Sequence, residues 1–201
     1  RKVPVKILHL AMPRTGSVSM MEAYKILGYT KYHGFDYIDP SRRHNLPKWE
    51  AAIDAKFYEK GRPYTKEDFD QDDFLGEFEV LSDFPCLAFT EEFLEWYPDA
   101  KVILVHRDME KWYHSFDSQL ISALETPMAW LLLNVFEPWC LSMRPATTMR
   151  KMQYAMFDCR DQAGFRANAR DTYRRHYAFV KSRVDAGRLL EYRLGSGWEP
   201  L

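Results

Sequence analysis

The stretch from Val5 to Leu27, VKILHLAMPRTGSVSMMEAYKIL, limits the choice of fold more than any other part of the chain. It begins with a short apolar run rich in β-branched residues, which ends at a proline-containing turn and favours a strand. After Ser17 the apolar residues recur at helical spacing. The stretch therefore predicts a strand, a tight loop and a helix in succession.

The predicted loop offers the groups that bind a phosphate. It carries a basic side chain at Arg14, a glycine at Gly16, and hydroxyl groups at Thr15, Ser17 and Ser19. Backbone N–H groups at the start of a helix have no partner within the helix and carry the positive end of the helix dipole, so they attract an anion. The loop therefore predicts an anion site, and a turn that only joins a strand to a helix is the alternative.

This loop differs from the phosphate-binding loop of nucleoside-triphosphate enzymes. That loop, GxxxxGK[ST], has a lysine directly after its last glycine. In this chain Ser17 follows Gly16, and the basic residue Arg14 comes two positions before the glycine. A small-molecule kinase is therefore the weaker alternative.

Strand-like and helix-like segments alternate along the rest of the chain. Further strands are predicted over residues 78–81, 101–105 and 189–192, and helices over 46–59, 65–75, 90–97, 110–124 and 160–184. This alternation implies parallel strands joined by right-handed crossovers. We expect one three-layer α/β/α domain with a central parallel sheet over residues 1–201.

Composition limits the partners. The chain has 28 Lys and Arg against 29 Asp and Glu, so its net charge gives no general attraction for nucleic acid or an anionic membrane. The three cysteines lack CxxC spacing, so we expect no metal site, no disulfide framework, and a reducing, cytoplasmic compartment. Because the sequence starts at Arg1 and stops after GWEPL, we expect both natural termini to lie beyond it. The oligomeric state stays open, with a homodimer as one alternative.

Three of the predicted strands end in residues suited to chemistry: PRTGS after the first, SDFP after the second and HRD after the third. Ligands bind beyond the carboxyl ends of parallel strands, so we expect these segments to form one site. Ser115 follows Arg107 by eight residues, about two turns into a helix that begins near Met109, so both could bind one phosphate. An ion pair between Arg107 and Asp108 is the alternative.

These motifs carry a family resemblance. PRTGSVSM resembles the phosphosulfate-binding loop of sulfotransferases, and Arg107 with Ser115 resembles their 3′-phosphate motif. With YPDAKVILVHRDMEKWYHS and GWEPL, they resemble the P-loop sulfotransferase-like family abundant in fungi, over Ile7 to Leu201. The resemblance implies the P-loop NTPase-like sulfotransferase fold. It also implies metal-free transfer of a sulfuryl group from 3′-phosphoadenosine 5′-phosphosulfate (PAPS) to an alcohol, phenol or amine, leaving adenosine 3′,5′-bisphosphate (PAP).

The resemblance also implies a role for each matching residue. Arg14 would stabilise the bridging oxygen of the leaving phosphate, while Arg107 and Ser115 would hold the 3′-phosphate. The 5′-phosphosulfate would lie in a cradle formed by Thr15, Gly16, Ser17, Val18 and Ser19.

The sequence leaves the general base open. Cytosolic sulfotransferases have a histidine in a THLP-like motif after the second strand, whereas the matching segment here is SDFP and offers Asp83. An ordinary aspartate is a weak base for an alcohol, so burial beside Phe84 and Phe89 would have to raise the pKa of Asp83. His33 is the competing candidate. The missing histidine also keeps open a non-catalytic nucleotide-binding or interaction module of the same fold.

The segment 127–141 is apolar almost throughout but too short to span a bilayer. A helix packed in the core is one prediction for it. In the alternatives, Trp130, Phe136 and Trp139, with Met143 after them, wall an acceptor pocket or dock on a membrane surface. We expect the acceptor to be a small, apolar or aromatic molecule.

Overall fold

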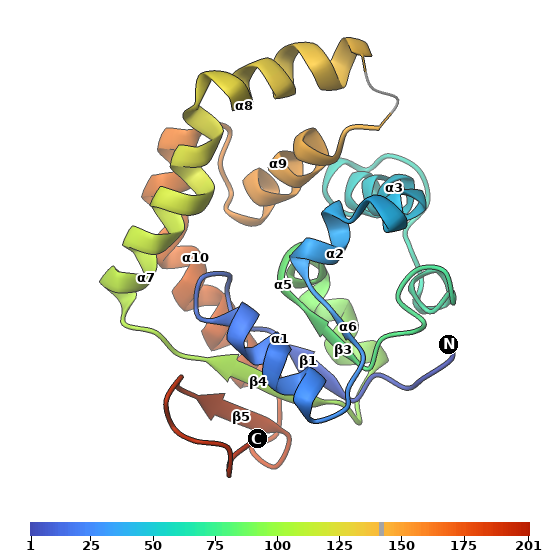
Figure 1. The fold of residues 1–201 in the computed structure, drawn as a ribbon, viewed down its shortest axis with the longest axis vertical. Helices are drawn as coiled ribbons and strands as arrows, with labels where there is room; N and C mark the ends of the chain where they lie inside the picture. Colours follow the sequence, from blue (N-terminus) through green and yellow to red (C-terminus); the bar gives the residue numbers. More distant parts are fainter. Residues whose placement is uncertain (141–142) are drawn as a thin grey trace.

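In the computed structural model, which describes residues 1–140 and 143–201, the chain folds around one parallel sheet (Figure 1). Its five strands lie in the order β2-β3-β1-β4-β5, and each neighbouring pair is parallel. The strands are β1 (Ile7–His9), β2 (Lys31–Tyr32), β3 (Val80–Ser82), β4 (Lys101–Val105) and β5 (Leu189–Tyr192). The predicted α/β fold with a central parallel sheet is confirmed.

The first strand lies at the centre of this sheet. Strands of a parallel sheet are covered on both faces, so they need continuous apolar runs, and all three residues of β1 are buried. Ile7 is in register with Val80 of β3 on one side and with Lys101 of β4 on the other. The carboxyl ends of β3, β1 and β4 are therefore neighbours, and the segments SDFP, PRTGS and HRD follow adjacent strands, as predicted.

Helices fill the connections and flank the sheet, with α1 in front of it and α10 behind it in Figure 1. The α-helices before β4 are α1 (Ser17–Ile26), α2 (Gly34–Ile38), α3 (Leu46–Tyr58), α4 (Lys66–Phe69), α5 (Asp83–Cys86) and α6 (Thr90–Trp96). After β4 come α7 (Met109–Phe116), α8 (Pro127–Leu131), α9 (Pro145–Met156) and α10 (Gln162–Arg183). Short 3₁₀ and π-helical segments are η1 (Pro40–Asn45), η2 (Leu87–Phe89), η3 (Asp117–Ile121), η4 (Ser122–Glu125) and η5 (Leu132–Cys140).

One predicted helix is too long, and one short strand was missed. The helix predicted over 65–75 starts correctly, where Thr65 and Asp68 form a capping box, but it ends at Phe69. Beyond it the chain turns back, and the Gly76 N–H donates to the Gln71 carbonyl oxygen. Strand β2 was not predicted, because two residues are too few for an alternating pattern to show.

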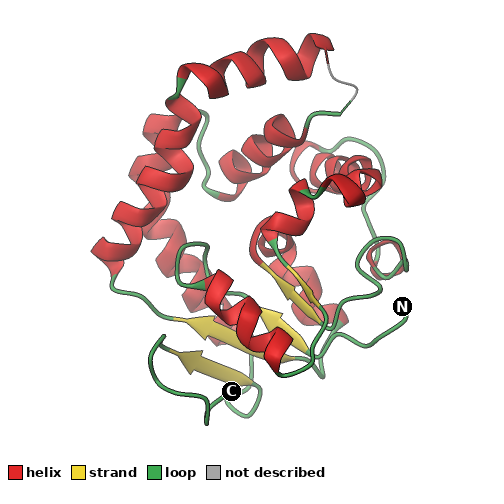
Figure 2. Ribbon diagram, viewed as in Figure 1, coloured by secondary structure: helices red, strands yellow, loops and turns green. Residues whose placement is uncertain are grey.

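The chain between β4 and α10 extends away from the sheet as a series of helices (Figure 2). The helix predicted over 110–124 is α7 followed by the π-helical η3 and the 3₁₀-helical η4. No helix in the described part of the chain is both long and apolar enough to cross a membrane.

The apolar segment predicted over 127–141 forms α8 and η5, and its last residue, Leu141, lies outside the described residues. Trp130 is 60% exposed and Trp139 is 81% exposed, whereas Leu133 and Glu137 are buried. The prediction of a core helix is therefore wrong for most of this segment, because apolar composition alone does not show which face the rest of the chain covers.

Candidate functional site

The loop between β1 and α1 leaves a row of backbone donors without partners in the part of the protein that the structure describes. Arg14 and Gly16 adopt left-handed backbone conformations, with φ of +71° and +108°. The Thr15 hydroxyl is buried and donates to the Met12 carbonyl oxygen at 2.7 Å. Among the described residues, no protein oxygen accepts from the N–H groups of 14–19. The start of α1 therefore has the donors that an anion site needs.

The two predicted phosphate motifs meet at this loop. A nitrogen of the Arg107 guanidinium donates to the Arg14 carbonyl oxygen. Arg14 Nε donates to Ser115 Oγ at 3.2 Å, from α7, which begins where the spacing argument requires. Asp108 instead caps α7 by accepting from the Lys111 N–H at 3.0 Å. The structure thus brings Arg14, Arg107 and Ser115 together, and Asp108 has a different partner from the one considered above.

The segment after β5 lies against the same loop. A Cβ atom placed on Gly16 would lie only 2.1 Å from Leu194 Cδ1. Sequence reasoning missed this contact because an apolar residue in a loop far along the chain carries no chemical signature.

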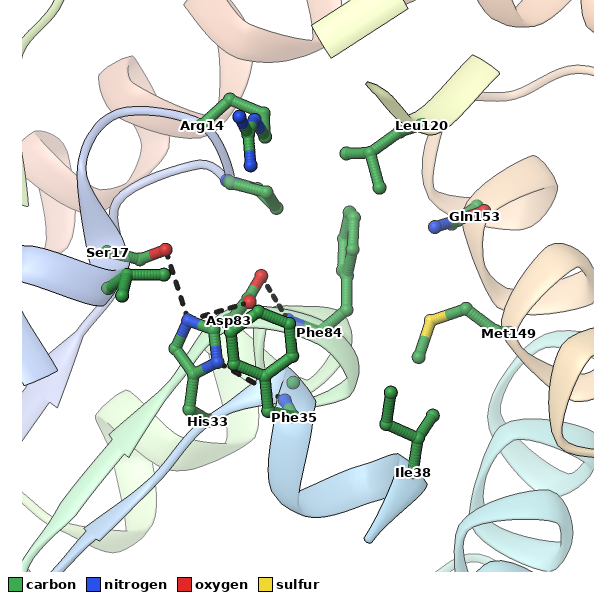
Figure 3. A pocket seen from close by; sticks show the side chains of 13 residues that line it. Arg14, Ser17, His33, Phe35, Ile38, Asp83, Phe84, Leu120, Met149 and Gln153 are labelled. Carbon is green, nitrogen blue, oxygen red and sulfur yellow. Dashed lines mark hydrogen bonds and ion pairs between the residues drawn. The ribbon is translucent and has the colours of Figure 1, made fainter. Parts of the chain in front are cut away.

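The two competing base candidates, Asp83 and His33, lie side by side (Figure 3). His33 Nε2 is 3.1 Å from Asp83 Oδ2 and 3.1 Å from Ser17 Oγ. His33 also caps α2, because its Nδ1 accepts the Phe35 N–H at 3.2 Å. A ring nitrogen that accepts an N–H carries no proton, so we assign the proton of the neutral imidazole to Nε2. His33 therefore donates toward Asp83.

Burial shifts the pKa of both groups in this pair. His33 is 4% exposed, and the Asp83 side chain is 13% exposed. Burial lowers the pKa of His33 although Asp83 attracts its charged form, and it raises the pKa of Asp83 although His33 opposes this shift. A lowered pKa keeps His33 neutral, in agreement with the tautomer. A raised pKa makes Asp83 a stronger base than an ordinary aspartate.

A cavity of about 210 Å³ lies beside Asp83, and Arg14, Ser17 and His33 form part of its polar wall. Apolar side chains from several elements form most of the remaining wall: Phe35, Ile38, Phe84, Leu120 and Met149. Figure 3 shows these side chains around the space between the loop, α2 and α9. Gln153 of α9 also lines the cavity, and sequence reasoning gave no signal for it.

The pocket wall proposed from the sequence is different. The candidates were Trp130, Phe136, Trp139 and Met143, and none of these four described residues lines the cavity beside Asp83. That prediction is wrong for this cavity. Leu120 of η3 and Met149 of α9 lie there instead, because the chain between α7 and α9 carries the exposed tryptophans away from the loop.

The sequence is similar to known proteins over nearly its whole length. The sequence matches the family described as "Sulfotransferase domain" over residues 6–201. It is also similar to a protein of Aspergillus versicolor named "Ava biosynthesis cluster protein M". The two are 34% identical over 207 residues, which cover 98% of this chain and 74% of the relative.

Proposed function

Because the chain belongs to the sulfotransferase family, we propose that it transfers a sulfuryl group from PAPS to a hydroxyl group of a small acceptor in the cavity beside Asp83. The observation that carries the proposal is the meeting of Arg14, Arg107 and Ser115 at the loop, directly next to the cavity. The relative's name refers to a biosynthesis cluster, which supports a small-molecule acceptor.

The residues present suit a donor with a phosphate group at each end. The unpaired N–H groups of the loop suit the 5′-phosphosulfate, and Gly16 lets the backbone approach it closely. Arg107 and Ser115 suit the 3′-phosphate, since a guanidinium forms strong charge-assisted hydrogen bonds with phosphate oxygens. Recognition of this second phosphate would separate PAPS from ATP.

The mechanism assigns one task to each side chain. When bound, the donor supplies the sulfuryl group that the acceptor oxygen receives. Arg14 stabilises the negative charge on the departing phosphate oxygen. Asp83 takes the proton of the acceptor hydroxyl, and the Nε2–H of His33 holds the carboxylate in place. The apolar side chains of the cavity wall offer water few hydrogen-bond partners, which disfavours water as a competing acceptor.

Of the two base candidates we choose Asp83. His33 has no lone pair free for a substrate proton, because Nδ1 accepts from Phe35 and Nε2 is protonated. The buried Asp83–His33 pair also favours an enzyme over a non-catalytic binding module. The free cysteines, Cys86, Cys140 and Cys159, support a cytoplasmic location. A homodimer stays a prediction.

Two arginine variants test the proposal. We expect Arg14→Ala to lower the kcat of sulfation by at least about 100-fold, as for loss of one transition-state donor, while PAP still binds. Arg107→Ala should weaken PAP binding first. Turnover is measured by mass spectrometry of the sulfated product and binding by calorimetry. Arg174→Ala, at an exposed arginine of α10, is the matched control. If both site variants kept wild-type turnover with PAPS, the assigned site would be wrong.

A further inference from the structure

The cavity wall contains one amide side chain, that of Gln153. Gln153 is 4% exposed as a whole residue. Its backbone carbonyl oxygen accepts from the Phe157 N–H, but within residues 1–140 and 143–201 its side chain makes no hydrogen bond. The amide atoms are not themselves closed off by the protein, so the amide opens to the cavity. A ligand that fills the cavity displaces water from this amide, and a polar group on the ligand would replace the lost hydrogen bond.

The position of this amide fixes where that polar group must lie. In Figure 3, Gln153 and Met149 project from α9 on the side of the cavity away from Asp83 and His33. The space between the two sides is bounded by apolar side chains. A ligand that reaches both Asp83 and Gln153 must therefore have polar groups at two ends of an apolar body.

The size and lining of the cavity suit one ring. An engineered apolar cavity of roughly 150 Å³ binds benzene, so a cavity of about 210 Å³ has room for a benzene ring with small substituents. Phe35 and Phe84 offer the edge and offset contacts that aromatic rings prefer.

The base also favours an aromatic hydroxyl. A phenol has a pKa of about 10, as in tyrosine. An aliphatic alcohol is far less acidic, so its proton moves to a carboxylate with a much less favourable driving force. A carboxylate base is therefore better matched to a phenol.

We propose that the acceptor is a monocyclic phenol with a second hydrogen-bonding group across the ring, an inference that rests on the proposed function. Gln153 binds this second group, and Asp83 faces the phenol hydroxyl. In the reaction a bond forms between the phenol oxygen and sulfur as the bond from sulfur to the 5′-phosphate oxygen breaks. The phenol proton passes to Asp83, and the leaving oxygen keeps the electron pair. The products are an aryl sulfate and PAP.

The test uses two phenols of similar shape, 4-hydroxyacetophenone and 4-isopropylphenol, because only the first has a hydrogen-bonding group opposite the hydroxyl. Their dissociation constants from the PAP-loaded protein are measured by calorimetry, and kcat/KM is measured with PAPS. We expect 4-hydroxyacetophenone to bind about 3- to 10-fold more tightly than 4-isopropylphenol, because its ketone oxygen gains one neutral hydrogen bond. Gln153→Met keeps the side-chain length and should remove this gain.

The ratio of the two dissociation constants is compared between the wild-type protein and Gln153→Met. The difference in acidity between the two phenols is the same in both proteins, so it cancels. Met149→Leu, at an apolar position of the same wall, is the control and should retain the ratio of the two affinities. Thermal unfolding checks that both variants fold. This inference would be wrong if Gln153→Met left the affinity ratio of the two phenols unchanged, or if the PAP-loaded protein bound neither phenol. Neither result would contradict the proposed sulfuryl transfer. Failure of PAP itself to bind would instead contradict the proposed function.

Discussion

At the scale of single residues, the chemistry of His33 is decided by one backbone contact. The Phe35 N–H, at the first turn of α2, occupies the Nδ1 lone pair and leaves the Nε2 proton directed at Asp83 and Ser17. A histidine in this state orients a carboxylate but does not accept a proton from the substrate. The assignment of Asp83 as the base therefore depends on how α2 begins.

Replacement of the proposed base tests this assignment. We expect Asp83→Asn to lower kcat by at least about 100-fold, since a general base contributes that much or more. PAP binding should stay unchanged, because asparagine keeps the shape and tolerates the left-handed backbone at position 83, where φ is +58°. Fixed-time sulfation assays measure the change in kcat, and calorimetry measures PAP binding. Asp171→Asn, at an exposed residue of α10, serves as the control, and near-normal turnover of Asp83→Asn would rule out this base.

The pH profile tests the role of His33. Asp83 works when deprotonated, so kcat falls as the pH drops through its pKa, which burial raises above that of an ordinary aspartate. His33→Leu removes a donor that stabilises the carboxylate, so the pKa of Asp83 should rise and the acidic limb of the kcat profile should move to higher pH. His33→Gln, which keeps an N–H donor, should move the limb less. A limb that stays in place in His33→Leu would contradict the positioning role.

Some of these residues could be predicted from the sequence. Arg14, Arg107 and Ser115 were expected to lie together because charge, glycine and hydroxyl groups at strand ends form a pattern along the chain, and the structure places them in contact. The His33–Asp83 pair was not, because its members are 50 residues apart and only the pairing of β2 with β3 brings them together. Gln153 left no signal, since a glutamine in a helix is ordinary until its surroundings are known.

At the scale of elements, the start of α1 depends on the left-handed conformation of Gly16. Alanine there is strained, and its Cβ would displace Leu194. We expect Gly16→Ala to destabilise the protein by about 1–3 kcal/mol and to weaken PAP binding, because relaxation of φ turns the N–H groups of the loop away.

Gly28→Ala is the matched control for this change. Gly28, just after α1, also has a positive φ, of +86°, but a Cβ there meets no atom within 4 Å. In urea unfolding, Gly28→Ala should lower the free energy of unfolding by a similar amount, because its backbone is strained in the same way. In calorimetry it should bind PAP with normal affinity. Equal PAP affinity in the two variants would show that the conformation of Gly16 does not matter for the donor.

The buried Glu137 fixes the position of the helix that carries the cavity wall. Its Oε1 accepts from the Ala146 N–H and its Oε2 from the Thr147 N–H, both at 2.7 Å, so it joins η5 to the first turn of α9. Glu137 is 1% exposed. We expect Glu137→Ala to lower the free energy of unfolding by about 2–3 kcal/mol, because it leaves two backbone donors without their charged acceptor.

Urea denaturation measures this loss, with Glu125→Ala as the control. Glu125 pairs with Arg166 near the surface, where solvent screens the ion pair, so its loss should lower the free energy of unfolding far less. If the two variants were equally stable, Glu137 would not anchor α9.

At the scale of the whole molecule, the alternation of strands and helices was enough to predict a parallel sheet, because connections of helical length force that geometry. The prediction of a buried helix failed for α8 and η5. In α8 and η5 the sequence shows apolar residues but not their neighbours, and Trp130 and Trp139 prove to be exposed. Which helix closes the cavity is set by tertiary contacts, such as the one from Glu137 to α9, that no local pattern encodes.

We propose that this edge of the sheet recognises a nucleotide with two separate phosphate groups. The direct test is calorimetric titration of the wild-type protein, without metal, with PAP, adenosine 5′-phosphate and ATP. We predict that PAP binds at least about 100-fold more tightly than adenosine 5′-phosphate, since Arg107 and Ser115 would gain charge-assisted hydrogen bonds only from the 3′-phosphate. If ATP bound as tightly as PAP, or bound only with magnesium, the site would not recognise the 3′-phosphate. If a folded protein bound none of the three nucleotides, this edge of the sheet would not be a nucleotide site.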